Sequence, residues 1–239
     1  MTKLKDETRQ KLMGVSVATL STALFKRGLR NQTIQDVAPV AAKGRNMVGP
    51  AYTLRYIPAR EDLNQLEVFR DPAHPQRAGV EGCPQGAVMI MDSRKDARAA
   101  SAGSILVTRL MVRNVAGVVT DGGFRDSPEI GRLDIPAYHN RPSAPTNLTL
   151  HQAIDLNVPI GCGDVAVWPG DIVVGDDEAV IVIPAHLAHE VATDAVEMTA
   201  FEDFVAEEVR NGRSIIGLYP ATQQKTFDDF SRWREKNNR

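Results

Sequence analysis

The spacing of apolar and polar positions predicts an α/β chain. Apolar residues recur with a helical period between residues 6 and 28, and this helix is expected to end at Gly28. Helical patterns return at about 104–114 and, in one long stretch, at about 185–211. Short apolar runs predict strands at 47–57, 86–91, 116–121 and 135–139, and residues 158–184 have β character throughout.

Strands and helices alternate in the middle of the chain, whereas the third quarter has strands separated by turn residues. This mixture predicts an α/β domain with mixed sheets that include antiparallel strands, and not a doubly wound fold. No linker rich in proline, glycine or serine divides the 239 residues, so we expect a single domain over 1–239. The helices at both ends are expected to pack on the core or on a neighbouring subunit, and the segment RSIIGLY (213–219) to form a short helix or strand.

Composition narrows the class of protein without naming a function. Hydrophobic residues make up 43% and charged residues 24%, the formal net charge is −2, and no basic stripe suggests a nucleic-acid partner. No apolar run approaches the roughly 18 residues that a membrane span needs, and the N-terminus is polar. Cys83 and Cys162 have neither the spacing of a disulfide framework nor that of a zinc site. We therefore expect a cytoplasmic protein with no nucleic-acid and no membrane partner.

The first candidate site is the segment AASAGSIL, residues 99–106. A helix begins here at Ser104 or Ile105, directly after Gly103. Free backbone N–H groups at a helix start carry partial positive charge and suit a carboxylate or a phosphate. The plainer alternative is that Ser104 is an ordinary N-cap residue.

The second candidate site is DGGFRD, residues 121–126, which follows an apolar strand. Neighbouring residues on a strand point to opposite faces, so Arg125 and Asp126 are expected to have separate partners. An arginine grips a carboxylate, an aspartate can hold Mg²⁺ or Mn²⁺, and the two glycines would let the backbone approach a ligand closely. The alternative is a helix N-terminus, with Asp126 as the cap, Pro128 in the first turn and Glu129 complementing the helix dipole.

The two segments are expected to meet. The strand that ends at Asp121 returns the chain after the 104–114 helix, so the helix start and the strand end can share one edge of the sheet. The N–H groups and Arg125 would then clamp a 2-oxo carboxylate, with a metal at Asp126 polarising the keto oxygen. Motifs for covalent serine catalysis, phosphoryl transfer and zinc proteolysis are absent from the sequence. Weaker candidates are His186 with His189 for a metal, His139–Arg141 for the pocket wall, and Asp176–Glu178, which fits a hairpin turn better than calcium.

The sequence resembles the RraA-like family. The resemblance covers about residues 10–215 and rests on VATLSTALFKRG (17–28), MVGPAYTL (47–54), AGSILVTRLMVRNVAGVVTDGGFRD (102–126) and the β-rich segment 158–184. This family includes 4-hydroxy-4-methyl-2-oxoglutarate aldolases, oxaloacetate decarboxylases and the regulator of ribonuclease E activity. The resemblance implies a swivelling α/β/β domain that forms homotrimers or hexamers, with 216–239 as a C-terminal tail.

The resemblance also assigns roles to individual residues. The backbone of Gly103, Ser104, Ile105 and Leu106 would receive the pyruvyl carboxylate of the substrate. Arg125 would bind the carboxylate and keto oxygen and stabilise the enolate, and Asp126 would hold Mg²⁺ or Mn²⁺. Glu202 is the best match for a glutamate that approaches the metal from a neighbouring subunit.

One position departs from the family pattern. Aldolase members carry an aspartate twenty-one positions before the arginine, where this chain has Ser104. A serine is a weaker proton acceptor, and general acid–base help is typically worth about 10²–10⁴-fold in rate. In the mechanism that we expect, Asp121 or Ser104 orients a water that moves the proton.

The leading hypothesis is therefore a metal-dependent lyase acting on a small 2-oxo acid by aldol cleavage or decarboxylation. Two alternatives stay open. One is a hydratase or dehydratase of a 2-keto-3-deoxy sugar acid, and the other is a non-catalytic protein that binds a ribonuclease.

Overall fold

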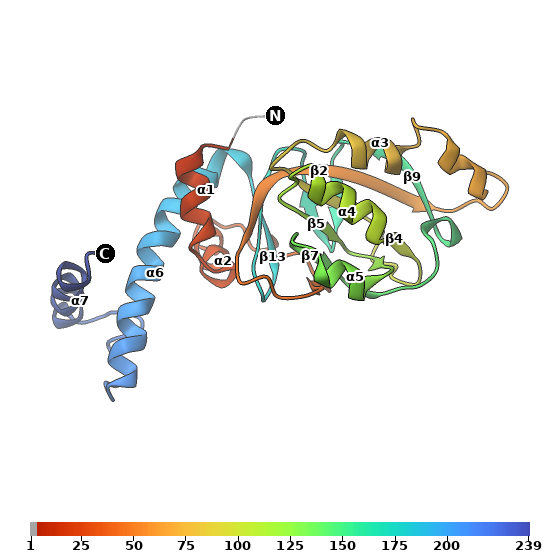
Figure 1. The fold of residues 1–239 in the computed structure, drawn as a ribbon. Coiled ribbons are helices and arrows are strands. Elements are labelled where there is room, and N and C mark those ends of the chain that lie inside the picture. Colours follow the sequence, from red (N-terminus) through yellow and green to blue (C-terminus); the bar gives the residue numbers. More distant parts are fainter. Residues whose placement is uncertain (1–3) are drawn as a thin grey trace.

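The computed structural model describes residues 4–239 and is built around a mixed sheet of eight strands (Figure 1). The strand order is β1-β7-β5-β3-β2-β12-β13, and β9 also pairs with β2. The central strands β2, β3, β5 and β7 are parallel, whereas β12 and β13 are antiparallel. The strands are β1 (Ala38–Pro39), β2 (Met47–Pro58), β3 (Val88–Asp92), β4 (Ala100–Ala102), β5 (Gly117–Thr120), β6 (Gly123–Phe124), β7 (Ala137–His139), β8 (Arg141–Pro142), β9 (His151–Leu156), β10 (Ile160–Cys162), β11 (Val165–Val167), β12 (Ile172–Gly175) and β13 (Val180–Ile183).

Strand β2 connects the two halves of this sheet. Its first residues pair with β12 and its last residues with β9, while β3 runs parallel along its other edge. The strand passes so close to its neighbour that a Cβ at Gly49 would lie 2.4 Å from the Gly86 carbonyl oxygen. Glycine is therefore required at this crossing.

The helices cover both the faces and the ends of the sheet. Residues 6–28 form two helices and not the single one expected, because Ser16 starts a new helix: its Oγ accepts a hydrogen bond from the Thr19 N–H at 3.1 Å. The helices are α1 (Asp6–Met13), α2 (Val17–Phe25), η1 (Leu66–Arg70), α3 (Pro75–Gly82), α4 (Ser104–Val112), α5 (Ser127–Arg132), η2 (Asn147–Thr149), η3 (Ala185–Leu187), α6 (Ala188–Arg210) and α7 (Gln224–Asn237).

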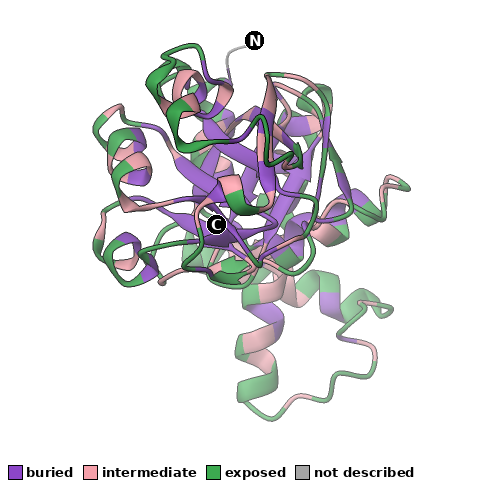
Figure 2. Cartoon of the chain, turned by 90° about the vertical axis from the view of Figure 1, so that its right-hand side faces the viewer, coloured by how far each residue is buried: buried purple, intermediate pink, exposed green. Residues whose placement is uncertain are grey.

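Three layers of apolar side chains hold the domain together. Helices α3, α4 and α5 pack on one face of the sheet, and the β10–β11 hairpin packs on the other. Helices α1, α2 and α6 cover β12 and β13. Figure 2 shows the buried residues concentrated in the sheet between these layers. This arrangement confirms the predicted fold class, an α/β domain with mixed sheets and flanking N- and C-terminal helices.

The C-terminal segment differs from its prediction. RSIIGLY forms turns and neither a helix nor a strand, and the residues beyond it form α7. Helix α7 packs beside the distal half of α6 (Figure 1), where Phe230 and Trp233 contact Phe201 and Phe204. Packing of these aromatic rings stabilises α7 against α6. Within residues 4–239, no helix has both the length and the apolarity needed to cross a membrane.

Candidate active site

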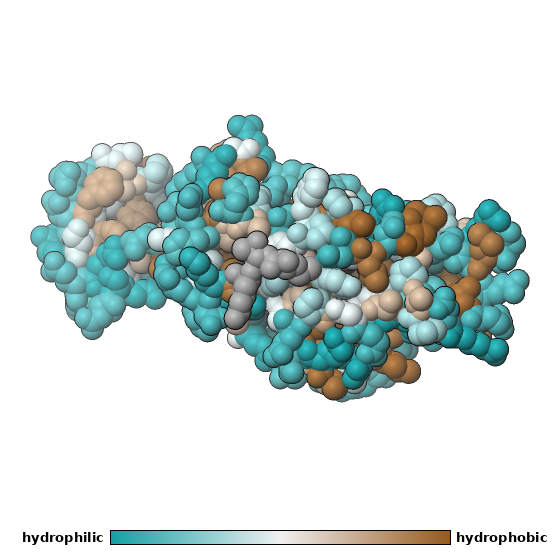
Figure 3. Space-filling view, turned by 90° about the horizontal axis from the view of Figure 1, so that it is seen from above, coloured by the Kyte–Doolittle hydropathy of each residue, from teal (hydrophilic) through white to brown (hydrophobic). Residues whose placement is uncertain are grey.

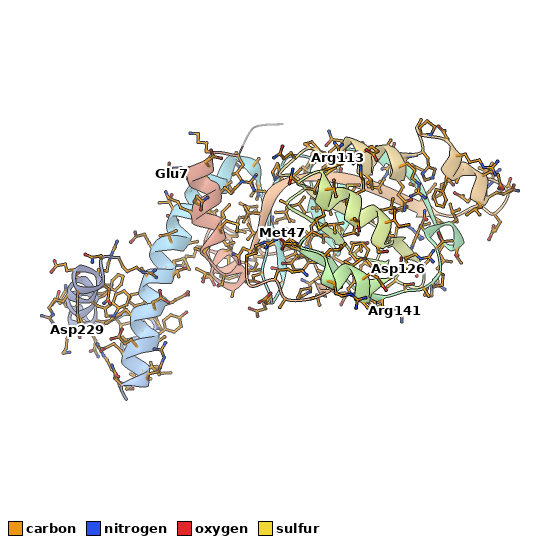
Figure 4. All side chains as sticks on the ribbon, viewed as in Figure 1. Glu7, Met47, Arg113, Asp126, Arg141 and Asp229 are labelled. Atoms are coloured by element: carbon orange, nitrogen blue, oxygen red, sulfur yellow. The ribbon has the colours of Figure 1, made fainter. Side chains whose placement is uncertain are left out.

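A cleft of about 420 Å³ lies between the start of α4 and the start of α5. The strands β4 and β6 bring its two walls together, because they pair in parallel and each leads directly into one of the helices. Asp126 lies at this end of the domain, far from α6 and α7 (Figure 4). The lining residues are Leu66, Phe69, Gln76, Arg77, Ala100, Ala102, Gly103, Ile105, Leu106, Arg125, Asp126, Thr146 and Asn147.

The N-terminus of α4 forms one wall of this cleft. The N-cap residue is Gly103, not Ser104, so the start of the helix has no cap from its own side chain. Instead, Asp126 accepts hydrogen bonds through Oδ2 from the Ser104 N–H at 3.3 Å and from the Ser104 hydroxyl at 3.2 Å. The helix start thus presents N–H groups and the positive end of its dipole to the cleft.

Asp126 has an unusual backbone conformation. It lies in the left-handed region, with φ 55° and ψ 35°, at the N-cap position of α5. Its backbone carbonyl accepts the Glu129 and Ile130 N–H groups, but its side chain makes no cap on α5 and turns to Ser104. The alternative prediction placed Asp126 at the N-cap of a helix, and this position is correct. Its side chain, however, does not cap that helix. Aspartate tolerates this conformation better than most residues, and seven other described non-glycine residues also have positive φ, so the backbone angle alone does not mark a functional site.

Arg125 and Asp126 are not on a strand, so the argument from opposite strand faces does not apply to them. Strand β6 ends at Phe124, and the turn that follows brings Arg125 Nε to 3.8 Å from Asp126 Oδ1. This contact is loose, and the two side chains are 47% and 41% exposed. Among residues 4–239, the Arg125 guanidinium has no hydrogen-bond partner, which leaves its donors directed at the cleft and solvent.

Gly103 allows the two walls to meet. A Cβ on this residue would lie 2.8 Å from Arg125 Cγ and 3.0 Å from Asp126 Oδ2. Any larger residue would push the arginine and the aspartate away from the start of α4. Glycine at position 103 is therefore required for the close approach of the start of α4 to Arg125 and Asp126.

The glycines of the DGGFRD segment have another role. Both Gly122 and Gly123 are buried and neither lines the cleft. A Cβ on Gly122 would lie 2.6 Å from Ser93 Cβ, and one on Gly123 would lie 2.5 Å from Ser143 Cβ. The expectation that these glycines let the backbone approach a ligand is wrong. They instead allow other segments of the same chain to pack closely against the backbone.

Asp121 is also remote from the cleft. Its side chain is completely buried and accepts three backbone N–H groups, from Ser93 at 2.6 Å, Lys95 at 3.0 Å and Gly163 at 3.1 Å. Burial raises the pKa of this carboxyl, and the three N–H groups oppose that shift. With both oxygens occupied, Asp121 fastens three loops together and is not placed to orient a water in the cleft, contrary to expectation.

The remaining candidates lie elsewhere. His139 is buried and stacks on Phe124 with ring centroids 5.7 Å apart, and none of residues 139–141 lines the cleft. Burial lowers the pKa of His139 to about 4. In the described part of the chain, no three His, Cys, Asp or Glu side chains gather as a metal site, and His189 instead contacts the Thr8 hydroxyl at 3.1 Å. Asp176 accepts the Glu178 N–H in a hairpin turn, as expected.

Glu202 and Asp126 are at opposite ends of the chain's fold. Glu202 lies on α6 and accepts a hydrogen bond from the Thr19 hydroxyl at 2.8 Å. It also borders a separate groove of about 530 Å³ between α6 and α7. Within one copy of the chain, therefore, the structure does not bring Glu202 to Asp126.

Sequence reasoning missed the far wall of the cleft. This wall consists of η1, the start of α3 and η2, with Phe69, Gln76, Arg77 and Asn147 facing the cavity. Hydrophobic side chains gather on this end of the molecule when it is seen from above (Figure 3), and Leu66 and Ile105 at the cleft are 69% and 82% exposed. No local pattern in residues 58–85 predicts an element, so nothing in the sequence drew attention to them.

Comparisons with known proteins agree with this fold. A model of the RraA-like family, described as Aldolase/RraA, matches residues 17–182. The chain belongs to the RraA-like family.

Three proteins similar to this chain illustrate the match. A protein of Halalkalibacterium halodurans named as a candidate 4-hydroxy-4-methyl-2-oxoglutarate aldolase is 31% identical over 66% of this chain and 68% of its own length. Protein DlpA of Legionella pneumophila is 23% identical over 86% of this chain, which spans only 32% of DlpA. The crystal structure of Streptomyces coelicolor RraAS2, described as an unusual member of the RNase ES inhibitor RraA family, superimposes with a TM-score of 0.75 at 26% identity. That match covers 85% of this chain and 98% of RraAS2.

Proposed function

We propose that this protein is a divalent-metal-dependent lyase that cleaves a carbon–carbon bond in a small 2-oxo acid. One observation carries the proposal: Arg125, whose guanidinium has no hydrogen-bond partner within residues 4–239, shares a cleft with the start of α4. A carboxylate and an adjacent keto oxygen are the groups that these donors suit. The H. halodurans relative, named for an aldolase of this class, supports the same reading.

Each part of the cleft has a role in this reaction. The start of α4 receives the substrate carboxylate through the N–H groups of Gly103 and Ile105, since the Ser104 N–H donates to Asp126 and the Leu106 N–H to the Gly103 carbonyl. The Arg125 guanidinium binds the 2-oxo oxygen. In aldol cleavage the 4-hydroxyl loses its proton, the C3–C4 bond breaks, and its electron pair moves into the 2-oxo group as an enolate. Arg125 stabilises that negative charge, and protonation at C3 then gives pyruvate.

Asp126 is the residue that would hold the metal. Mg²⁺ commonly binds through one or two carboxylates, with water and substrate oxygens as the other ligands, and Asp126 offers one half-exposed carboxylate in the cleft. A bound Mg²⁺ or Mn²⁺ would supply Lewis-acid polarisation of the 2-oxo group. Glu202 of a second copy is the further carboxylate that a homotrimer or a hexamer would add.

Ser104 is the group best placed to handle a proton. Its hydroxyl lies 3.2 Å from Asp126 Oδ2, beside the N–H groups proposed to hold the carboxylate. A serine–carboxylate pair relays protons less strongly than two carboxylates do, so we expect slow turnover compared with relatives that carry aspartate here.

Pyruvate release tests the proposal. Oxaloacetate and 4-hydroxy-4-methyl-2-oxoglutarate are each supplied with Mg²⁺ or Mn²⁺ and then with EDTA. We expect EDTA-sensitive release that Arg125→Ala abolishes and Arg141→Ala preserves, because Arg141 is an exposed arginine at the same end of the sheet but outside the cleft. Equal release from both variants would contradict the assigned site. Release of water in place of pyruvate would favour the hydratase or dehydratase alternative.

A protein-binding role is the second candidate, and a separate surface favours it. The groove between α6 and α7 exposes Tyr219 and Phe227, which are 54% and 48% accessible. RraAS2, a structural neighbour, is described within a family of RNase ES inhibitors. Binding to a ribonuclease that survives Arg125→Ala but fails in Phe227→Asp would support this function. A complex lost in Arg125→Ala would argue against it.

A further inference from the structure

Strand β4 leads into the start of α4 at the cleft, and it has little support from other strands. In the three-stranded sheet β4-β6-β8 it is an edge strand, and among residues 4–239 it pairs with β6 alone. The Arg125 N–H donates to the Ala102 carbonyl of β4 at 3.1 Å. This bond ties the residue before Gly103 to Arg125, so the position of β4 sets how the start of α4 and Arg125 face each other.

Two side chains from other elements hold Ser101, the middle residue of β4. Its carbonyl oxygen accepts a hydrogen bond from the Tyr56 hydroxyl at 2.8 Å and another from Gln76 Nε2 at 2.6 Å. Gln76 Nε2 also donates to the Tyr56 hydroxyl at 3.1 Å, and all three residues are at most 2% exposed. Because these hydrogen bonds are shielded from water, they restrain β4, which a single strand partner would hold less firmly.

The side chain of Ser101 is held as well. Its hydroxyl lies 2.7 Å from the Ser93 hydroxyl and 2.6 Å from the Thr120 hydroxyl, and all three residues are completely buried. Thr120 Oγ1 also accepts the Gly122 N–H at 2.9 Å. Ser101 is therefore fixed through its carbonyl and through its side chain, two residues before the N-cap of α4.

Tyr56 reaches Ser101 from an irregular point of strand β2. The register between β2 and β9 shifts between Arg55 and Tyr56, and such irregularities redirect side chains. Burial raises the pKa of the Tyr56 hydroxyl, so this group remains a hydrogen-bond donor at neutral pH. The residues that line the cleft include Gln76 but not Tyr56. Any effect of Tyr56 on a ligand in the cleft must therefore be transmitted through β4.

We propose that Tyr56 and Gln76 are positioning residues that act through Ser101, because they hold the start of α4 at the separation from Arg125 that the ligand requires. This inference rests on the proposed function, which assigns the substrate carboxylate to the start of α4 and the 2-oxo oxygen to Arg125. Loss of either donor should loosen β4 and displace the N–H groups of Gly103 and Ile105. Small displacements of binding groups weaken binding and slow the reaction.

Tyr56→Phe is the main test, and Tyr138→Phe is its matched control. Tyr138 is also buried and donates its hydroxyl to a backbone carbonyl, that of Asp176 at 3.0 Å, but it lies outside the cleft. Both variants should lose similar stability, because each loses a tyrosine hydroxyl bonded to a carbonyl. Titration calorimetry with saturating Mg²⁺ should show pyruvate binding about 3- to 10-fold more weakly to Tyr56→Phe than to the wild type. Tyr138→Phe should bind pyruvate as tightly as the wild type does.

Two further measurements separate positioning from general damage to the site. The Mn²⁺ affinity, which the proposed function assigns to Asp126, should be the same in Tyr56→Phe and in the wild type. Gln76→Met removes the second donor to Ser101 and should also weaken pyruvate binding. If Gln76→Met weakened binding and Tyr56→Phe did not, Gln76 would act by direct contact with the ligand, and the inference would be wrong.

The outcomes distinguish this inference from the proposed function. If the wild type binds pyruvate and Arg125→Ala does not, equal affinities in Tyr56→Phe and Tyr138→Phe would overturn the inference alone. An equal loss of Mn²⁺ and pyruvate affinity in Tyr56→Phe would also overturn it, because the whole site would then be disturbed. If the wild type showed no pyruvate binding that depends on Arg125, the proposed function would fail and the inference with it.

Discussion

Two aspartates only five positions apart have opposite environments. Asp121 is completely buried and saturated by three backbone N–H groups, whereas Asp126 is 41% exposed and held at positive φ beside the start of α4. Both belong to the segment DGGFRD, and both follow short strands. The same residue type thus holds loops together through hydrogen bonds at one end of the segment and lines a cleft at the other.

The difference shows that one aspartate of this segment has a structural role and the other is the candidate for a chemical role. The pKa of Asp121 is raised because burial disfavours its charge, and its position allows no contact with a ligand in the cleft. A raised pKa in a buried aspartate is often taken as a sign of catalysis. Here the hydrogen bonds give a structural explanation, so Asp126, which lines the cleft, is the better candidate for function.

The largest effect is expected from Asp126→Asn. Asparagine tolerates the left-handed conformation and keeps the shape of the side chain, but it removes the charge proposed to hold the metal. Pyruvate release should fall by about 10²–10³-fold, with the melting temperature little changed. The exposed Asp177→Asn serves as the matched control. If Asp126→Asn released pyruvate at the wild-type rate, Asp126 would not be a ligand of the metal.

Asp121→Ala should have the opposite profile. The substitution leaves three buried N–H groups without their acceptor, and the free energy of unfolding should fall by about 2–4 kcal/mol. Activity per folded molecule should change little. Urea unfolding gives the first quantity, and rates corrected for the folded fraction give the second. A stable but inactive Asp121→Ala protein would show that this residue takes part in the chemistry after all.

The comparison also explains what the sequence could and could not predict. Strands β3 and β5 were predictable as short continuous apolar runs, and the long helix α6 was predictable because its apolar residues recur with a helical period over several turns. Strands β4, β6 and β8 have only two or three residues each, too few for any period. These strands form because separate segments of the chain meet near the cleft. Their formation depends on the tertiary structure and not on a local sequence pattern.

Some residues of the candidate site were likewise predictable from local sequence, and others were not. Gly103, Arg125 and Asp126 were predictable because a glycine before a helix and charges after a strand are local signals. The structural role of Asp121 and the contribution of Gln76 and Tyr56 depend on partners across the fold. No spacing rule within a segment reveals those partners.

A third prediction concerns pH and the buried side of the segment, where His139 stacks on Phe124. Burial lowers the pKa of His139 from 6.5 to about 4, so the unfolded state binds a proton in a range where the folded state does not. Stability should therefore decrease as pH falls from about 6.5 to 4, with His139 accounting for roughly 2–3 kcal/mol.

Unfolding curves of wild type and His139→Phe between pH 7 and pH 4 measure this contribution. The variant cannot titrate at this position, so its curve should be flatter by that amount. His74 and His151 also have lowered pKa values through burial, and they contribute to the pH dependence that remains. Parallel curves for the two proteins would mean that His139 is protonated equally in both states.

The smallest expected effect belongs to Ser104→Asp, which introduces the residue that the family resemblance leads us to expect at this position. Ser104 Oγ lies 3.2 Å from Asp126 Oδ2, so an aspartate here places a second carboxylate beside the first. Without metal the two charges repel each other, and with metal they share it. We expect Mn²⁺ affinity to rise about tenfold, measured by paramagnetic titration, together with a slightly lower melting temperature in EDTA. Ser104→Asn is the neutral control of equal size. If both variants bind Mn²⁺ as the wild type does, the cation is not held between positions 104 and 126. The exposed end of the DGGFRD segment would then bind a ligand without a metal.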